Sequence, residues 1–312
     1  MEFKHLPVLK NEVLDFFSAD DIGHQSASGG GIFVDGTLGG GGHTLALLSF
    51  LQTTNYRLQT KIIGIDRDLE AIFAAKKNLT DFSKQVTFVH DNFSNLPAIL
   101  KSINVKKADG IFLDLGVSSY QLENPARGFS FQNDVPLDMR MNQEDDLTAS
   151  DIVNYYDEKK LADIFWNLAD ERYSRRIAKN IVHSRKLAPI KTTGDLVEII
   201  RNSTPTANQH KQKIHFATRV FQALRIETNS ELKVLEDFIP TASELLNSGG
   251  RLAIISFHSK EDRIVKWAFR KLIADFPDKF KILTKKPIVP SLSEISTNPR
   301  ARSAKLRVLE RI

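Results

Sequence analysis

The sequence predicts an α/β protein built on a doubly wound, mostly parallel sheet into which an all-helical domain is inserted. Three observations carry this prediction. Short apolar runs alternate with helical patterns in the first third of the chain and return near its end. Four consecutive glycines, Gly39–Gly42, follow the first apolar run. From about residue 127 to residue 212 the strand signals fade and helical spacing dominates.

Composition is that of an ordinary globular protein. The 312 residues are 41% apolar, which is enough for a large core, and the length allows more than one domain. The sequence has no apolar run near membrane-spanning length and no secretory signal, so we expect a cytoplasmic protein without membrane contact. Cysteine is absent and the eight histidines do not fall at ligand spacings, so we expect no metal site. The net charge of +5 mildly favours an anionic partner.

Acidic residues follow the four predicted strands of the first third. The strands are expected at residues 32–34, 61–65, 86–90 and 109–113, and the acids are Asp35, Asp66, Asp91 and Asp114. Because ligands of open α/β sheets bind outside the carboxyl ends of the strands, we expect these acids to converge on one site. The alternative is that they only cap the helices that follow.

The glycine run lies between the first strand and a helix predicted to start near Thr44. Glycines let a backbone turn sharply and approach a ligand, and the positive end of the helix points to the same place. This arrangement indicates a nucleotide-type cofactor, although a glycine run is also typical of a flexible turn. Asp66 lies 24 residues beyond Gly42, a spacing that suits either NAD or S-adenosylmethionine.

The sequence pattern in the middle of the chain predicts helices. One starts after Thr148-Ala-Ser-Asp151, and another is indicated by apolar residues spaced over 161–168. Farther on, basic residues recur at i, i+3, i+4 and i+7: Arg172, Arg175, Arg176 and Lys179. This stripe is either a solvated face, with Glu171 pairing Arg175, or a phosphate-binding surface. Residues 204–212 read as a polar linker.

The sheet pattern returns in the last third. A helix is expected over 231–246, a fifth strand over 251–257, a helix over 264–276 and two closing strands near 281–284 and 305–310. Basic residues of the tail are either phosphate contacts or solvated: Lys281, Lys285, Lys286, Arg300, Arg302, Lys305, Arg307 and Arg311.

Longer motifs resemble those of a bacterial 16S ribosomal RNA cytosine-N4 methyltransferase family, which uses S-adenosylmethionine. The matching blocks are DGTLGGGGHT (35–44), GIDRD (64–68), LDLGVSSYQL (113–122), RGFSF (127–131), LDMRM (137–141), TRVFQALRI (218–226), ISFHS (255–259) and NPRARSAKLR (298–307). They keep their order and span essentially the whole chain. Three positions depart from the family pattern: Tyr120, Phe216 and Lys260.

The resemblance implies a Rossmann-like class I methyltransferase domain formed by residues 1–126 and 215–312. Residues 127–214 would then be an inserted helical RNA-recognition domain. The implied cofactor is S-adenosylmethionine, and its implied contacts are Gly41, Gly42, His43, Asp66, Phe93, Asp114 and Gln121. The implied partner is 16S rRNA in the small ribosomal subunit, with naked rRNA left open, and a homodimer is also implied.

The implied reaction is methyl transfer to the exocyclic N4 amine of a decoding-region cytosine. This amine is a poor nucleophile, so the site needs an acceptor that orients it against the methyl donor. Asp114 is the catalytic candidate, although the chain lacks the Pro-Pro-aromatic segment common in amino methyltransferases. His258 and Ser259 would reach the same crevice, or would merely cap a helix.

Some alternatives remain at the level of sequence. Phe93 is otherwise a core residue, and Gln121 a solvated loop residue. Other functions that we considered are a DNA amino-methyltransferase, a nicotinamide-dependent dehydrogenase and a non-catalytic RNA-binding protein. The missing Pro-Pro segment and the polyglycine loop disfavour the first two.

Overall fold

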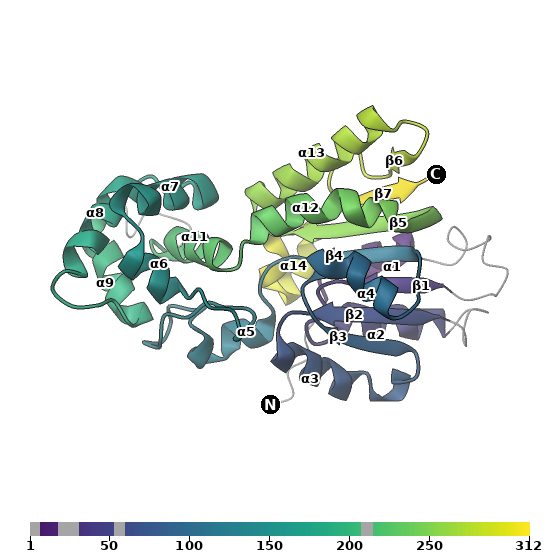
Figure 1. Ribbon diagram of the computed structural model, residues 1–312, viewed down its shortest axis with the longest axis horizontal. Coiled ribbons are helices and arrows are strands. Elements are labelled where there is room, and N and C mark those ends of the chain that lie inside the picture. The colour runs from purple at the N-terminus through teal and green to yellow at the C-terminus, as the bar shows by residue number, and fades with distance from the viewer. Residues whose placement is uncertain (1–6, 18–30, 53–59, 207–214) are drawn as a thin grey trace. The chain divides into compact units, whose positions relative to one another are not determined.

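The computed structural model describes residues 7–17, 31–52, 60–206 and 215–312, and it divides into two compact units. The first unit comprises Met1–Ser118 and Leu232–Ile312, and the second comprises Ser119–Glu231 (Figure 1). These boundaries differ from the expected 126/127 and 214/215. The second one shifts because helix α11 (Thr218–Thr228) packs against α7 (Glu158–Ala169). Residues 207–212 of the expected linker lie outside the described residues.

Within the described residues, the first unit contains a seven-stranded sheet of order β3-β2-β1-β4-β5-β7-β6. The strands are β1 (Ile32–Asp35), β2 (Lys61–Asp66), β3 (Val86–His90), β4 (Ala108–Asp114), β5 (Leu246–Ser256), β6 (Phe280–Ile282) and β7 (Lys305–Arg311). Strands β1 to β5 pair in parallel, and β7 runs antiparallel to both β5 and β6. The doubly wound, mostly parallel sheet is therefore confirmed.

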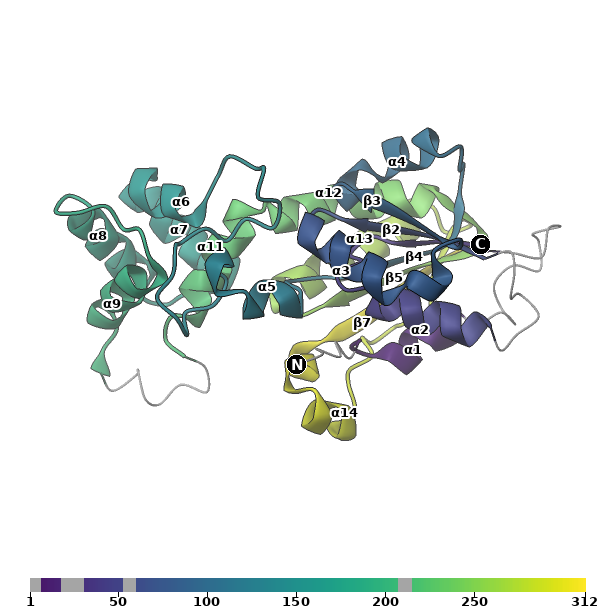
Figure 2. The ribbon, with the colours of Figure 1, turned by 90° about the horizontal axis from the view of Figure 1, so that it is seen from below.

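Helices cover both faces of this sheet. One apolar core joins the strands to α1 (Lys10–Phe16), α2 (Gly42–Leu51) and α3 (Leu69–Asn78). The other joins them to α4 (Leu96–Ser102), α12 (Glu231–Glu244) and α13 (Ser259–Asp275). Figure 2 shows α4 on one side of the sheet and α1 and α2 on the other. A short helix, α14 (Leu292–Thr297), follows β6 along the chain.

Two-sided burial explains the apolar strand sequences. Phe33 packs into one core and its neighbour Val34 into the other, because successive side chains point to opposite faces. In β4 every residue except the last is buried. Parallel strands covered on both faces read as continuous apolar runs, and this is the pattern that predicted them.

The second unit is helical. Its helices are α5 (Ser119–Glu123), α6 (Ala149–Tyr155), α7, α8 (Ser174–Ser184), α9 (Thr193–Ser203) and α11. Helix α6 begins with a capping box between Thr148 and Asp151, at the predicted start. The inward positions Ile152, Leu161 and Ile177 are fully buried.

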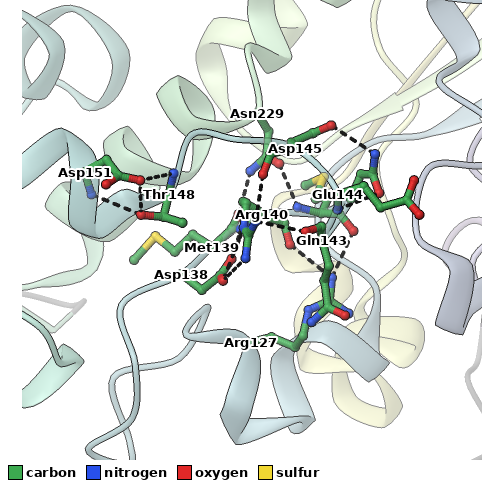
Figure 3. Close-up of polar contacts among 12 residues, drawn as sticks. Arg127, Asp138, Met139, Arg140, Gln143, Glu144, Asp145, Thr148, Asp151 and Asn229 are labelled. Atoms are coloured by element: carbon green, nitrogen blue, oxygen red, sulfur yellow. Dashed lines mark hydrogen bonds and ion pairs between the residues drawn. The ribbon is translucent and has the colours of Figure 1, made fainter.

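A polar clamp holds the loops of the second unit (Figure 3). The buried guanidinium of Arg127 donates through Nη2 to the carbonyls of Met141 at 2.9 Å and Arg140 at 3.0 Å. Asn229 of α11 donates to the carbonyl of Met139 and accepts from the amide of Met141, both at 2.8 Å. The clamp therefore binds the segments 127–131 and 137–141 to each other and to α11.

Candidate cofactor and active site

Three of the four strand-end acids lie on adjacent strands at the carboxyl edge of the sheet. Asp35 of β1 is in register with Gly64 and Phe112, so Asp66 and Asp114 stand two residues farther along the flanking strands. The fourth acid serves a local turn. Asp91 Oδ1 accepts hydrogen bonds from the Asn92 amide and from Asn95 Nδ2, both at 2.7 Å. The expected convergence thus holds for Asp35, Asp66 and Asp114. Asp91 instead binds groups of the next turn, and the cap of the following helix is its neighbour Asn92.

Asp66 anchors the glycine loop to the end of β2. Its Oδ2 accepts from the amide of Gly39 at 2.7 Å, and its Oδ1 from the amide of Asp68 at 2.9 Å. Burial raises the pKa of Asp66 to about 6, although both backbone hydrogen bonds lower it. A carboxylate offers about four acceptor positions, so Asp66 retains capacity for hydroxyl donors of a ligand.

The glycine loop makes a tight turn into α2. Gly41 is the N-cap residue, has φ +79°, and donates its amide hydrogen to the Leu38 carbonyl at 2.7 Å. A Cβ at this position would lie 2.8 Å from Cδ1 of Leu79. Gly42 and His43 open the helix, where amide groups lack intrahelical partners. The turn therefore requires glycine at Gly41 and leaves amide donors for a ligand.

Buried His43 and partly buried Asp114 form a polar pair with unsatisfied atoms. Nε2 of His43 lies 3.5 Å from Oδ2 of Asp114, and the imidazole packs on the Phe112 ring at 4.5 Å between centroids. Among the described residues, neither His43 Nε2 nor Asp114 Oδ1 has a hydrogen-bond partner. Buried polar atoms are normally satisfied, so this pair fits a site that a polar ligand completes.

Asp35, at the end of β1, binds the start of α2 next to this pair. It is buried, accepts from Thr44 Oγ1 at 2.8 Å, and has its pKa raised to about 6 by that burial. A cavity of about 20 Å³ lies beside Asp35, His43 and Thr44, and is otherwise lined mainly by apolar side chains. Thr37 links the loop to β4, since its Oγ1 accepts from the Asp114 amide at 2.6 Å.

The remaining candidates lie in different surroundings. Phe93 follows β3 and meets Phe238 of α12 edge-on at 4.9 Å, so it is packed against the core. Gln121 belongs to α5 of the second unit and is only 4% exposed, so the solvated-loop alternative is wrong. His258 caps α13 by accepting from the Glu261 amide at 3.4 Å, as the capping alternative predicted. Ser259 is the exposed first residue of that helix.

The basic stripe is shorter than the sequence pattern suggested. Helix α8 begins at Ser174, so Arg172 precedes it. The reason is that α7 ends at Asp170 with a left-handed φ of 52°, and Glu171 then accepts from the Tyr173 amide. In the described part of the chain no ion pair joins Glu171 to Arg175. The basic side chains are exposed, so the expectation of internal pairing is wrong.

An aromatic stack in the second unit was not predicted from the sequence. The rings of Phe131 and His215 stack with centroids 4.5 Å apart, and the Phe216 ring lies tilted against His215 at 4.1 Å. The pKa of His215 is lowered mainly by burial and also by the nearby positive charge of Arg201. The only sequence signal was the unusual Phe216, because the stack joins segments that are far apart in the chain. Tyr120, another departure, is 48% exposed.

Comparisons with known proteins give the family. The model of the MraW methylase family matches residues 2–312. Ribosomal RNA small subunit methyltransferase H of Clostridium botulinum (strain Loch Maree / Type A3) is 47% identical over 325 aligned residues, covering 100% of both chains. The enzyme of the same name from Thermosipho africanus is 47% identical over 311, covering 100% of this chain and 99% of that one.

The chain belongs to the MraW methylase family. Its first unit has a Rossmann-like fold, and its cofactor is S-adenosylmethionine. The carboxyl edge of the sheet fits this cofactor, since it combines the loop at Gly41, the carboxylate of Asp66 and the unsatisfied atoms of His43 and Asp114.

The described residues of this chain contain neither a membrane-spanning helix nor a metal-binding cluster. None of its described helices is both long and apolar enough to span a membrane. No group of three or more His, Asp or Glu side chains in the described ranges is arranged to hold a metal ion.

Proposed function

We propose that this chain transfers a methyl group from S-adenosylmethionine to the exocyclic N4 amine of cytosine 1402 in 16S rRNA. Full-length relatives at 47% identity carry the name ribosomal RNA small subunit methyltransferase H, which supports rRNA as the substrate. The observation that carries the site is the partly buried Asp114 carboxylate, whose buried Oδ1 has no hydrogen-bond partner among the described residues.

The proposed cofactor residues are Gly41, Gly42, His43, Asp66, Phe93, Asp114 and Gln121. Asp66 accepts from the ribose hydroxyls, and the amides around Gly41 and Gly42 approach the methionine portion. Phe93 offers an apolar ring to the adenine. Gln121 rests on the family resemblance alone. When bound, the cofactor supplies a methyl group on a positively charged sulfur.

Asp114 is proposed to orient the substrate amine. The lone pair of a cytosine amine is delocalised into the ring, so the nitrogen must pyramidalise before it attacks. A carboxylate that accepts an N–H hydrogen bond favours that geometry and stabilises the positive charge that develops on nitrogen. The free Oδ1 of Asp114 supplies this acceptor, and His43 lies 3.5 Å from the other oxygen, Oδ2.

Labelled methyl transfer tests the function. The purified protein is incubated with labelled S-adenosylmethionine and, separately, with small ribosomal subunits, naked 16S rRNA and DNA. We expect label in at least one RNA sample, and nuclease digestion with mass spectrometry should give N4-methylcytidine. Label only in DNA, or on another ribonucleoside, contradicts the proposal.

Asp114→Ala separates the two proposed roles of this carboxylate, which are contact with the cofactor and orientation of the substrate amine. If Asp114 orients the amine, single-turnover methyl transfer at saturating cofactor should fall by about 10²-fold or more, and any loss of cofactor affinity, from calorimetry, measures its proposed cofactor contact. Asp114→Asn keeps one acceptor oxygen and should retain more activity than Asp114→Ala. Near-normal turnover by Asp114→Ala would exclude the assignment.

The second unit is proposed to recognise the rRNA. Its exposed arginines and Lys179 suit phosphate contacts, and its aromatic stack suits an unpaired base. Ribosomal RNA as substrate also implies a cytoplasmic enzyme. The homodimer rests on the family resemblance alone, and light scattering on the purified protein tests it.

A further inference from the structure

A cationic hollow lies at the β6 edge of the sheet, between α13 and strands β6 and β7. It has a volume of about 470 Å³ and is lined by Lys266 and Arg270 of α13, Lys281 of β6, Lys285, Arg307 of β7 and seven other residues. Figure 1 shows α13 alongside these two strands. None of the proposed cofactor residues lines it.

The lining carries an excess of positive charge. It contains no Asp or Glu side chain. Arg307 is paired with Asp262 at 2.7 Å, but in the described part of the chain Lys266, Arg270, Lys281 and Lys285 have no carboxylate partner. The positive charge of these four side chains is therefore not compensated by the lining of the hollow. Such charge held close together costs stability and favours an anionic partner.

An exposed indole stands beside this hollow. Trp267 of α13 is 58% exposed, which is unusual for so large an apolar side chain. The cations of the hollow also contact its ring: Lys266 Nζ lies 5.7 Å and Arg270 Cζ 5.2 Å from the centroid. Aromatic faces flanked by cations are how proteins stack the bases of single-stranded nucleic acids.

We propose that the hollow is a docking site for single-stranded RNA of the substrate. Lys266, Arg270, Lys281 and Lys285 bind successive phosphates, and Trp267 stacks one base. This inference deepens the proposed function and rests on it, because it assigns to rRNA a contact outside the methyl-transfer crevice.

The location suits such a role. Arg307 is in register with Ile254, two residues before the carboxyl end of β5. Strands advance about 3.4 Å per residue, so this part of the hollow lies within roughly 7 Å, along the strand, of the edge that carries the crevice. Both sites belong to the first unit, so a strand of RNA that reaches the crevice can continue along the β6 edge.

The chain offers a closely matched pair of variants for the test. The site variant is Lys266→Gln with Lys285→Gln. The control is Lys271→Gln with Lys286→Gln, which makes the same chemical change on the same helix and loop at exposed lysines that do not line the hollow. Trp267→Ala and Trp267→Phe form a second pair, since phenylalanine keeps a stacking face.

Binding of a fluorescent single-stranded fragment of 16S rRNA is measured against salt concentration. For the site variant we expect weaker binding and a slope of log K against log salt that is shallower by about 1.4, given about 0.7 for each phosphate contact of a single strand. The control should match the wild type. Trp267→Ala should lose roughly five- to 150-fold in affinity, and Trp267→Phe much less.

Several outcomes overturn the inference. They are equal losses in the site and control variants, unchanged binding by Trp267→Ala, or a change of oligomeric state in the site variant without a change in RNA binding. Methyl transfer by the wild type to ribosomal substrates distinguishes a failure of the docking site from a failure of the proposed function. If the wild type methylates rRNA and the variants bind it normally, only the docking site fails. If the wild type does not act on rRNA, the proposed function fails as well.

Discussion

At the residue scale, the carboxyl edge of the sheet brings together polar groups that are desolvated or that lack hydrogen-bond partners. Asp35 and Asp66 have their pKa values raised to about 6 by burial, and His43 and Asp114 keep buried atoms without partners in the described structure. Such groups lower the stability of the ligand-free protein. Their retention at one edge of the sheet is explained by a ligand that they contact or support.

Asp35→Asn should stabilise the ligand-free protein at neutral pH. The folded-state pKa of about 6 exceeds the ordinary 3.8, so burying the ionised form costs stability progressively as the pH rises through this interval. A shift of about two units corresponds to about 3 kcal/mol. The melting temperature of the variant minus that of the wild type should therefore grow between pH 4 and pH 6 and then level off.

Asp262→Asn provides the opposite case. Burial raises the pKa of Asp262, but the hydrogen bonds and charges of Arg307 and Lys305 outweigh it and lower the pKa overall. Its contribution to stability is present above the ordinary pKa and is lost in acid. The melting temperature of Asp262→Asn minus that of the wild type should become more negative as the pH rises. Equal pH profiles for the two variants would contradict both assignments.

At the element scale, the site depends on how the loop after β1 enters α2. The amides of Gly36 and Leu38 donate to carbonyls of β4 and β2, so the loop continues the sheet briefly before it turns. The turn then needs positive φ at Gly39 and Gly41. A helix start held in this way keeps its free amides in a fixed position toward the carboxyl edge.

Gly41→Ala should damage this turn more than Gly40→Ala does. A left-handed conformation costs an L-residue about 1–2 kcal/mol, and the added methyl group would also meet Leu79 at 2.8 Å. At Gly40 the nearest atom would be 3.6 Å away and φ is not positive. Urea unfolding and calorimetry of cofactor binding should show losses for Gly41→Ala alone, and equal effects would refute this account of the loop.

Asn229→Ala should loosen the clamp of the second unit. Asn229 is 4% exposed and satisfies both the Met139 carbonyl and the Met141 amide. An unsatisfied buried polar group costs about 1–3 kcal/mol, so unfolding should require clearly less urea. Hydrogen exchange should accelerate at residues 137–141. Asn202→Ala, at an exposed position of α9, is the control and should change neither measurement.

At the scale of the whole molecule, a modest net charge is distributed unevenly. The excess is +5, yet exposed cations gather on α8 in one unit and around the β6 edge in the other. Many basic residues elsewhere are neutralised, such as Arg225 by Glu231 and Arg251 by Glu310. Unpaired cations, and not the total charge, therefore indicate where a polyanion binds.

Arg175→Gln with Lys179→Gln should weaken rRNA binding and flatten its dependence on salt. Two lost phosphate contacts reduce the slope of log K against log salt by about 1.4 for a single strand. The control pair is Lys159→Gln with Lys233→Gln, because both lysines are already paired with an aspartate at i+4. If the two pairs weaken binding equally, α8 is a solvated face and not a contact surface.

The sequence by itself determined the sheet, the glycine loop and the placing of acids at the strand ends, although it expected four of them to meet where three do. These follow from local rules: buried parallel strands are apolar throughout, tight turns need glycine, and parallel strands end at the same edge. The motifs also identified the family, because their residue order is preserved along the chain.

Only the tertiary structure decided what depends on contacts between distant segments. It showed Asp91 in a local turn and His258 as a helix cap. It also showed Asp114 and His43 as a pair with unsatisfied atoms, and the start of α8 beyond Arg172. It also brought Lys266, Arg270 and Lys285 to one hollow beside Trp267. Hydrogen-bond satisfaction and charge pairing are set by three-dimensional neighbours, which residue spacing along one chain does not specify.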